Sequence, residues 1–481
     1  MIAIQFQKRD FEYDVYNLVK SFYPKEEIAT FDEEHPAEEY DERISLFYGE
    51  NEISICIEKA GNPKSAQTER VEVLFEKDRK HTKNELKIML YRMLCERTGI
   101  ELPWGTLTGV RPTKIPMALL EQGYSNVETA KVLRETYLVN PEKTALAISI
   151  ANKERHILGE LDYENGYSLY VGIPFCPSIC AYCSFSSSPW KVWKNKVDGY
   201  LDALCLEIRE TAKIMAGKTL DTIYIGGGTP TTLEPEQMER LLCELEQYFD
   251  VHHVKEFTVE AGRPDSITRE KLAVIRKHPV TRISINPQTM NQETLDIIGR
   301  KHTVEDIRQS FALARELGFD NINMDLIVGL PGEGLEQMRK TMQEVTAMDP
   351  DSITVHSLAI KRAARLNMFK EDYQEMTFVN NQEIMEMAYQ YAVNAGQFPY
   401  YMYRQKNMEG NMENVGYAKP GKEGIYNILI MEEKQTILAL GAGASTKYVQ
   451  KDRIERAENV KDINQYISRI DEMIERKRKL L

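Results

Sequence analysis

Residues 170–183 read Tyr-Val-Gly-Ile-Pro-Phe-Cys-Pro-Ser-Ile-Cys-Ala-Tyr-Cys and place Cys176, Cys180 and Cys183 within eight positions. Thiolate sulfur is the usual protein ligand of [4Fe–4S] clusters, so three thiolates would hold three of the four irons. This loop has no fourth cysteine, and one iron would stay open to another molecule. Zinc sites usually combine two Cys-x2-Cys or Cys/His pairs, and no second pair is present. Three unrelated buried thiols are the other alternative; the spacing favours the cluster.

The bulk composition is that of a globular protein with two to four domains, at 481 residues, 42% hydrophobic and 28% charged. The net charge of −13 argues against nucleic acid or an anionic membrane as a partner. We find no signal-peptide pattern and no apolar run near the roughly 18 residues of a membrane span, and therefore expect a cytoplasmic protein without one. The other cysteines are scattered and are predicted to be single buried thiols: Cys56, Cys95, Cys205 and Cys243.

Residues 1–100 are predicted to form a small α/β domain. A helical pattern covers residues 84–97, and strand-like runs cover residues 1–6, 44–48, 53–58 and 71–75. Residues 101–165 are predicted to form a helical connector.

Residues 166–380 alternate between strand-like and helical patterns, which favours βαβ units and a parallel sheet. The β-rich runs are residues 168–173, 222–225, 256–259, 282–285, 323–328 and 352–356. Six repeats suit a partial TIM-like barrel, (β/α)6, within an α/β protein. Residues 381–481 are predicted to form a C-terminal α+β extension that covers the substrate, with a hairpin near residues 427–431.

Polar residues and glycines follow successive strands of this predicted barrel. Active sites of such folds gather at the carboxyl ends of the strands. The cysteine loop follows the first strand, and Gly226-Gly227-Gly228-Thr229 follows the second, where glycines allow close approach of a ligand. The later strands run into Glu260, Gln288, Asp325 and Ala359. Together these strand ends predict a small-molecule site.

Five segments, in order, resemble the oxygen-independent coproporphyrinogen III oxidases (dehydrogenases) and related heme chaperones, which are radical S-adenosylmethionine (SAM) proteins. Cys-x3-Cys-x2-Cys is the signature of that superfamily. The segments are Tyr-x-x-Ile-Pro-Phe-Cys at 170–176, Gly-Gly-Gly-Thr-Pro-Thr at 226–231, Arg-Ile-Ser-Ile-x-x-Gln at 282–288, Gly299-Arg300, and Asn-Met-Asp-Leu-Ile-x-Gly-Leu-Pro at 323–331. With a domain before the barrel, the chain is similar to the subgroup known in Gram-positive bacteria as a second coproporphyrinogen dehydrogenase.

The resemblance implies a role for each matching residue. Cys176, Cys180 and Cys183 would hold the [4Fe–4S] cluster, and SAM would chelate its open iron. Tyr170 and Tyr182 would line SAM. Its methionine end would be bordered by Gly227, Gly228 and Thr229. Its ribose and charged groups would be bound by Glu260, Gln288, Arg300 and Asp325. A second SAM is implied near Ala359 and the turn Gly441-Ala442-Gly443-Ala444.

The implied reaction is oxidative decarboxylation in heme biosynthesis. Reductive cleavage of SAM gives a radical that removes hydrogen from two propionates of coproporphyrinogen III, and loss of carbon dioxide leaves the vinyl groups of protoporphyrinogen IX. The electron would come from a flavodoxin- or ferredoxin-like donor. The cofactors perform the hard chemistry, so no catalytic side chain is predicted beyond those that hold them.

Three residues depart from the family pattern. Phe185 stands where the established oxidases have a further cysteine, as in the chaperone-like branch, and Gly172 replaces an expected histidine. Glu413 stands where a heme chaperone would have histidine, which argues against that function. Two alternatives stay open: anaerobic breakdown or methylation of heme with two SAM molecules, and heme delivery without catalysis.

A basic segment follows the sixth strand of the predicted barrel, with Lys361, Arg362 and Arg365. Guanidinium groups suit the propionate carboxylates of a tetrapyrrole. A solvated basic stretch is the alternative.

Overall fold

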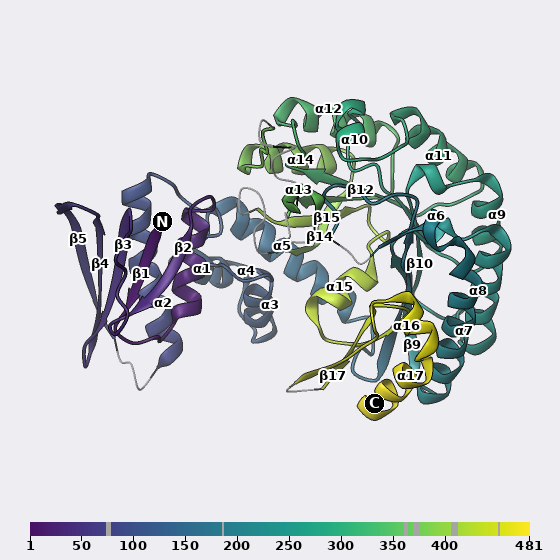
Figure 1. The fold of residues 1–481 in the computed structure, drawn as a ribbon, viewed down its shortest axis with the longest axis horizontal. Coiled ribbons are helices and arrows are strands. Elements are labelled where there is room, and N and C mark those ends of the chain that lie inside the picture. The colour runs from purple at the N-terminus through teal and green to yellow at the C-terminus, as the bar shows by residue number, and fades with distance from the viewer. Residues whose placement is uncertain are drawn as a thin grey trace. The chain divides into compact units, whose positions relative to one another are not determined.

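The computed structural model describes residues 1–73, 78–184, 187–359, 364–368, 373, 376–405, 412–450 and 453–481, the side chains of residues 365 and 367 apart. The chain divides into two compact units, Met1–Ser149 and Ile150–Leu481 (Figure 1). The division into four parts at residues 100, 165 and 380 stays a prediction.

The first unit contains a mixed sheet of order β2-β1-β3-β4-β5 with two helices packed against it. Its elements are β1 (Ile2–Phe6), α1 (Glu12–Phe22), β2 (Ile28–Asp32), β3 (Glu42–Tyr48), β4 (Glu52–Lys59), β5 (Asn62–Glu72) and α2 (Arg79–Thr98). Alternate residues of β4 enter the core, as Ile53, Ile55 and Ile57 do, because successive side chains of a strand face opposite sides. The sequence pattern missed β2, and it missed most of β5, an edge strand whose side chains are largely polar and exposed.

Three more helices end this unit and lead into the second. They are α3 (Lys114–Glu121), α4 (Asn126–Glu135) and α5 (Pro141–Leu158). Ser125 begins α4 with a capping box, in which its hydroxyl accepts from the Glu128 amide and the Glu128 carboxylate accepts from the Ser125 amide. The predicted helical character of this region is therefore observed.

The second unit is built on the predicted (β/α)6 partial barrel. In the described residues, six neighbouring strands run parallel: β6 (Gly166–Ile173), β9 (Thr219–Gly227), β10 (Glu256–Gly262), β11 (Arg282–Ile285), β12 (Ile322–Val328) and β13 (Ser352–Ser357). Helices along its outside (Figure 1) are α7 (Val197–Ile214), α8 (Pro235–Tyr248), α9 (Arg269–Lys277), α10 (Gln292–Ile297), α11 (Val304–Glu316) and α12 (Leu335–Ala347). The strand interiors are almost wholly buried, as expected of a sheet covered on both faces.

The C-terminal extension adds strands at both edges of this sheet. Beside β13 lie the antiparallel strands β15 (Asn414–Ala418) and β14 (Phe398–Tyr403). Beside β6 lies β16 (Thr436–Leu440), parallel to it, followed by antiparallel β17 (Ser445–Val449) and β18 (Ile454–Glu458). The other elements are β7 (Phe175–Cys176), β8 (Ser188–Pro189), α6 (Trp190–Trp193), α13 (Arg365–Met368), α14 (Gln382–Asn394), α15 (Ile425–Glu432), α16 (Ile463–Ser468) and α17 (Ile470–Leu480).

The predicted hairpin near residues 427–431 is wrong, because these residues lie within helix α15. The run Ile-Tyr-Asn-Ile-Leu-Ile suggested strands through its β-branched residues. Tyr426 and Leu429, one helical turn apart, are both buried, and tertiary packing has overridden the local preference.

A buried polar cluster joins the extension to the barrel. Lys477 of α17 and Glu207 of α7 form a fully buried ion pair of 2.5 Å. Asn459 donates to Glu207 and accepts from Lys477, both at 2.8 Å, and the Gly441 amide donates to Glu207 at 2.8 Å. Removing one partner of such a pair leaves an uncompensated buried charge and costs about 3–5 kcal/mol.

Within the described residues, no helix is both long and apolar enough to cross a membrane.

Candidate functional site

One cavity of about 580 Å³ lies among the barrel strands of the second unit. Its lining includes the three predicted cluster ligands and, apart from the turn at residues 441–444, the residues predicted around SAM: Tyr170, Cys176, Cys180, Tyr182, Cys183, Gly227, Gly228, Thr229, Glu260, Gln288, Arg300, Asp325 and Ala359. The structure therefore brings together residues that are far apart in sequence. Their contacts with cofactors stay predictions.

The turn at residues 441–444 is not among the residues that line this cavity. A Cβ atom at Gly441 would come within 2.5 Å of the Gly172 carbonyl oxygen, so this glycine allows the turn to pack against the end of β6. Its positive φ of 100° also favours glycine. The geometry gives Gly441 a structural role.

The cysteine loop leaves β6 and is fixed by backbone hydrogen bonds. The Cys183 amide donates to the Cys180 carbonyl at 3.1 Å, and the Ala181 amide donates to the Ile298 carbonyl at 2.9 Å. The Leu366 amide of α13 donates to the Ala181 carbonyl at 3.0 Å, so the segment after β13 reaches this loop. Cys176 and Cys180 are buried, and Cys183 is partly exposed within the cavity.

A buried arginine supplies positive charge beside the cysteines. Arg263 donates from Nη1 to Cys180 Sγ at 3.5 Å and to the Ser178 carbonyl at 2.9 Å. The Asp265 carboxylate accepts from Arg263 Nε and Nη2 at 2.9 and 2.7 Å. Although burial opposes it, contacts with His302 and Arg263 hold the pKa of Asp265 well below its usual range. Cationic neighbours favour thiolates, and the donor set therefore fits an anionic iron–sulfur cluster. No sequence motif had pointed to Arg263.

Arg300 and Gln288 are among the lining side chains that have a buried polar atom with no hydrogen-bond partner. Arg300 donates from Nη2 to the Tyr182 hydroxyl at 3.1 Å, but its Nε is unpartnered. Gln288, held at a φ of 68°, has an unpartnered Oε1. Buried polar groups of native proteins are usually satisfied, and a polar ligand in this cavity would satisfy both.

The glycines at the end of β9 let the chain approach the segment that leads from β6 to the cysteines. The Gly228 amide donates to the Ile173 carbonyl at 2.7 Å, and a Cβ atom at Gly228 would lie 2.6 Å from the Phe175 carbonyl oxygen. The Thr229 hydroxyl lies 3.6 Å from Cys176 Sγ. These glycines therefore serve close packing at the cavity wall, in addition to any ligand contact.

Two carboxylates on barrel strands, Glu260 of β10 and Asp325 of β12, have opposite pKa shifts. Burial raises the pKa of Glu260 to about 7; the hydrogen bond from Tyr224 opposes this and the charge of Asp325 adds to it. The pKa of Asp325 is lowered despite burial, because His356 lies 3.8 Å away and Asn323 donates to it at 2.7 Å. At neutral pH, Asp325 is ionised while Glu260 is near its titration midpoint.

Aromatic rings form another wall of the cavity. Tyr224 stacks on Tyr426 of α15 with centroids 4.6 Å apart, and Tyr170 stacks on Tyr224 at 6.3 Å. Tyr401 and Tyr403 of β14 stack at 6.3 Å. All five rings line the cavity. Stacked aromatic surfaces with a few polar groups suit a flat, largely apolar ligand. Except for Tyr170, the sequence analysis did not identify this wall.

The remaining sequence predictions concern the scattered cysteines, the basic segment and Phe185. Of the four scattered cysteines, Cys205 is buried as predicted, Cys56 and Cys95 are partly exposed, and the prediction is wrong for Cys243, which is exposed on α8. Lys361, Arg362 and Phe185 lie outside the described residues, as does the side chain of Arg365.

The Radical SAM superfamily model matches residues 170–345. The chain is 42% identical over 408 residues to the oxygen-independent coproporphyrinogen-III oxidase-like protein HemZ of Bacillus subtilis, covering 84% of this chain and 81% of that protein. It is 38% identical over 195 residues to the heme chaperone HemW of the same organism, covering 40% of this chain and 51% of HemW.

A solved structure shares the fold. Coproporphyrinogen III oxidase (HemN) from Escherichia coli, a radical SAM enzyme, aligns with a TM-score of 0.52 and 25% identity, covering 66% of this chain and 72% of HemN. The HemZ match spans most of both proteins. The chain belongs to the family of oxygen-independent coproporphyrinogen-III oxidase-like proteins, within the radical SAM superfamily.

Proposed function

We propose that this protein is a radical SAM enzyme that converts propionate groups of coproporphyrinogen III to vinyl groups. The observation that carries the proposal is that three cysteines, polar groups suited to SAM and a wall of five stacked tyrosine rings line one cavity. A flat tetrapyrrole could rest against the tyrosines while a propionate faces the cysteine end.

Family membership implies a [4Fe–4S] cluster and SAM. Together, when bound, they supply one-electron reduction and hydrogen-atom abstraction. Cys176, Cys180 and Cys183 would hold the cluster, and Arg263 would offset its negative charge. We assign the positioning of SAM to Tyr170, Tyr182, Gly227, Gly228, Thr229, Glu260, Gln288, Arg300, Asp325 and Ala359.

The protein's own contribution is orientation and exclusion of water. The rings of Tyr224, Tyr426 and Tyr401 would fix the plane of the substrate, since stacked aromatic contacts restrict tilting. Holding the reacting carbon near the radical source replaces a bimolecular encounter with an intramolecular one.

The electron would come from a flavodoxin- or ferredoxin-like donor. One or two SAM molecules would be used.

The surroundings of Glu413 favour catalysis over heme delivery. Glu413 is almost fully buried where a heme chaperone would have histidine. Burial lowers the pKa of nearby Arg404 to about 10, and the Glu413 charge partly offsets this. Among the described residues lining the cavity, His356 is the only histidine, and it lies between Asp325 and Tyr403, at 3.8 and 3.4 Å.

Anaerobic incubation tests the proposal. The reconstituted protein is mixed with SAM, a reductant and either coproporphyrinogen III or heme, with Cys180→Ala as the control, and products are identified by mass spectrometry. Vinyl products from coproporphyrinogen III, absent with the control, support decarboxylation. Ring-opened or methylated heme would replace the proposal with heme chemistry, and tight heme retention without turnover would replace it with heme delivery.

A further inference from the structure

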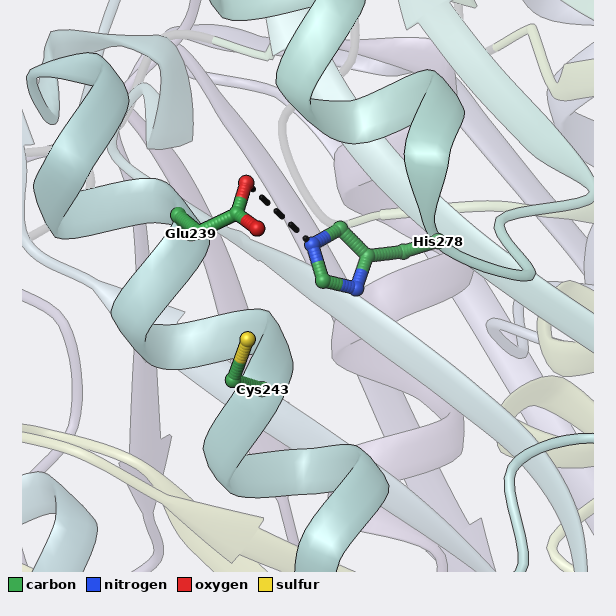
Figure 2. A group of neighbouring side chains, drawn as sticks. All are labelled: Glu239, Cys243 and His278. Atoms are coloured by element: carbon green, nitrogen blue, oxygen red, sulfur yellow. Dashed lines mark ion pairs between the residues drawn. The ribbon is translucent and has the colours of Figure 1, made fainter.

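Three potential metal ligands meet on the outer surface of the barrel, where α8 and α9 pack together (Figure 2). They are Glu239, Cys243 and His278, and one ligand atom of each lies within 4.8 Å of the other two. None of the three lines the cavity described above. The catalytic proposal therefore does not account for them.

The helices dictate this arrangement. Glu239 and Cys243 are four residues apart on α8, so their side chains lie on the same face, one turn apart. His278 is the residue that ends α9, and its imidazole extends back toward α8. Figure 2 shows the Glu239 carboxylate and the Cys243 thiol on one helix, both facing the imidazole of His278.

The imidazole of His278 is buried and oriented by a second carboxylate. Its side chain is 5% exposed, and Nδ1 lies 2.7 Å from Oε1 of Glu246. This contact leaves Nε2 directed toward Glu239. Metal-binding histidines commonly use one ring nitrogen for the metal and the other for a carboxylate that fixes the ring.

The facing atoms lack hydrogen-bond partners. His278 Nε2 and Glu239 Oε2 are both buried without one, and they lie 3.6 Å apart, beyond a good hydrogen bond. The ammonium of Lys277, on a side chain that is 66% exposed, is 3.9 Å from Glu239 and contributes little at that exposure. An ion between the two helices would satisfy both orphaned atoms.

We propose that Glu239, Cys243 and His278 bind a divalent transition-metal ion of the Zn²⁺ type, with water as the fourth ligand. Zinc bonds of about 2.0–2.3 Å to nitrogen, oxygen and sulfur place tetrahedral ligands roughly 3.3–3.7 Å apart. The present separations need to shorten by only about 1 Å. Binding releases the thiol proton of Cys243 to solvent, and the two anionic ligands then balance the dication.

The metal would join α8 to α9, the helices of two successive βα units. Its role would be structural and separate from the cysteine loop. Without a metal, the His278 ring lies between the carboxylates of Glu239 and Glu246, at 3.6 and 2.7 Å, and Cys243 takes no part in these contacts. Cys243 therefore takes part in the contacts only if a metal is bound.

Zinc binding to the full-length, cluster-reconstituted protein tests the proposal. The protein is dialysed against ZnCl₂ under anaerobic conditions, zinc is quantified by mass spectrometry, and the ligands are identified by X-ray absorption at the zinc edge. We expect one zinc per chain with one sulfur at about 2.3 Å and nitrogen or oxygen ligands otherwise. Glu246→Gln should weaken binding about 10- to 100-fold through loss of ring orientation.

Variants separate this site from the cysteine loop. Cys243→Ser, on an exposed position, should remove the sulfur signal and most of the zinc, and His278→Gln should do the same. Cys56→Ser and Glu236→Gln, the latter an exposed acid on α8, are matched controls that should retain zinc. Absence of zinc, three sulfur ligands, or zinc binding unchanged by Cys243→Ser would each overturn the proposal.

Discussion

Arg263 Nη1 lies 3.5 Å from Cys180 Sγ, with the guanidinium held on its other edge by Asp265. A buried cation is thereby fixed against a predicted cluster ligand. Such a charge stabilises the more negative, reduced form of an iron–sulfur cluster relative to the oxidised form. The contact would therefore raise the reduction potential at which a cluster bound to Cys180 accepts an electron.

Removing this charge should make the cluster harder to reduce. We expect Arg263→Met to shift the midpoint potential to a more negative value by on the order of 50 mV, where about 59 mV is a tenfold change for one electron. A redox titration followed by electron paramagnetic resonance measures it. Arg263→Lys should retain most of the potential, and Arg269→Gln, an exposed surface arginine, should retain all of it. Equal potentials for Arg263→Met and the parent would exclude the electrostatic role.

The protein should hold one [4Fe–4S] cluster after anaerobic reconstitution, because the cavity brings together a single cysteine triplet among the described residues. Cys180→Ala should lose the four-iron chromophore and SAM cleavage, as measured by iron and sulfide content and by absorbance. Cys205→Ser serves as the control, since that thiol is buried on α7 away from the loop. A stable four-iron cluster in Cys180→Ala would contradict the assignment.

Much of the candidate site could be predicted because it follows barrel strands in chain order. Glu260 and Asp325 lie within buried β-rich strands and Gln288 follows one, and the parallel sheet brings these strands into one barrel. The local pattern of sequence was therefore enough to place them together.

The remainder depended on long-range packing that local patterns do not encode. Tyr401 and Tyr426 come from the C-terminal extension, and their positions follow from the pairing of β14 with β15 and from α15 forming a helix. β16 joins the sheet beside β6, a partner far away in sequence. Arg263 was missed because its contact is with Cys180, which is 83 residues away in the sequence.

SAM affinity should depend on Asp325. Its ionised carboxylate, held by Asn323 and His356, is suited to ribose hydroxyls or a charged group of SAM. Loss of a charge-assisted hydrogen bond costs roughly 1.5–3 kcal/mol, so Asp325→Ala should bind SAM about ten- to a hundredfold more weakly. Isothermal titration measures this, and Asp320→Ala, an exposed aspartate just before the same strand, is the control. Unchanged affinity in Asp325→Ala would place SAM elsewhere.

Glu260 should make SAM binding depend on pH. Its pKa is raised from 4.5 to about 7, so the carboxylate is mostly protonated below pH 7 and ionised above it. Ionised oxygens accept ribose hydroxyls more strongly, and affinity should therefore increase as pH rises through about 7. Because the amino group of SAM also titrates, the test compares the parent with Glu260→Gln over pH 6–8. The parent should gain more affinity than the variant; parallel profiles would show that Glu260 does not titrate in contact with SAM.

The last prediction concerns recognition of the substrate carboxylates. Lys361, Arg362 and Arg365 follow the sixth barrel strand in the sequence, and guanidinium groups suit the carboxylates of a tetrapyrrole. Leu366, which the structure describes, donates its amide to the Ala181 carbonyl of the cysteine loop. Arg362→Ala should weaken porphyrin binding about tenfold, while SAM affinity and iron content stay unchanged.

Porphyrin titration monitored by fluorescence quenching compares Arg362→Ala with the parent and with Arg339→Ala, an exposed arginine on α12 that serves as a matched control. A solvated arginine would contribute nothing to a ligand, so equal affinities for Arg362→Ala and the parent would remove Arg362 from the site. A loss that Arg362→Lys restores only in part would indicate bidentate contact with a carboxylate, since a lysine supplies the charge but not the planar pair of donors.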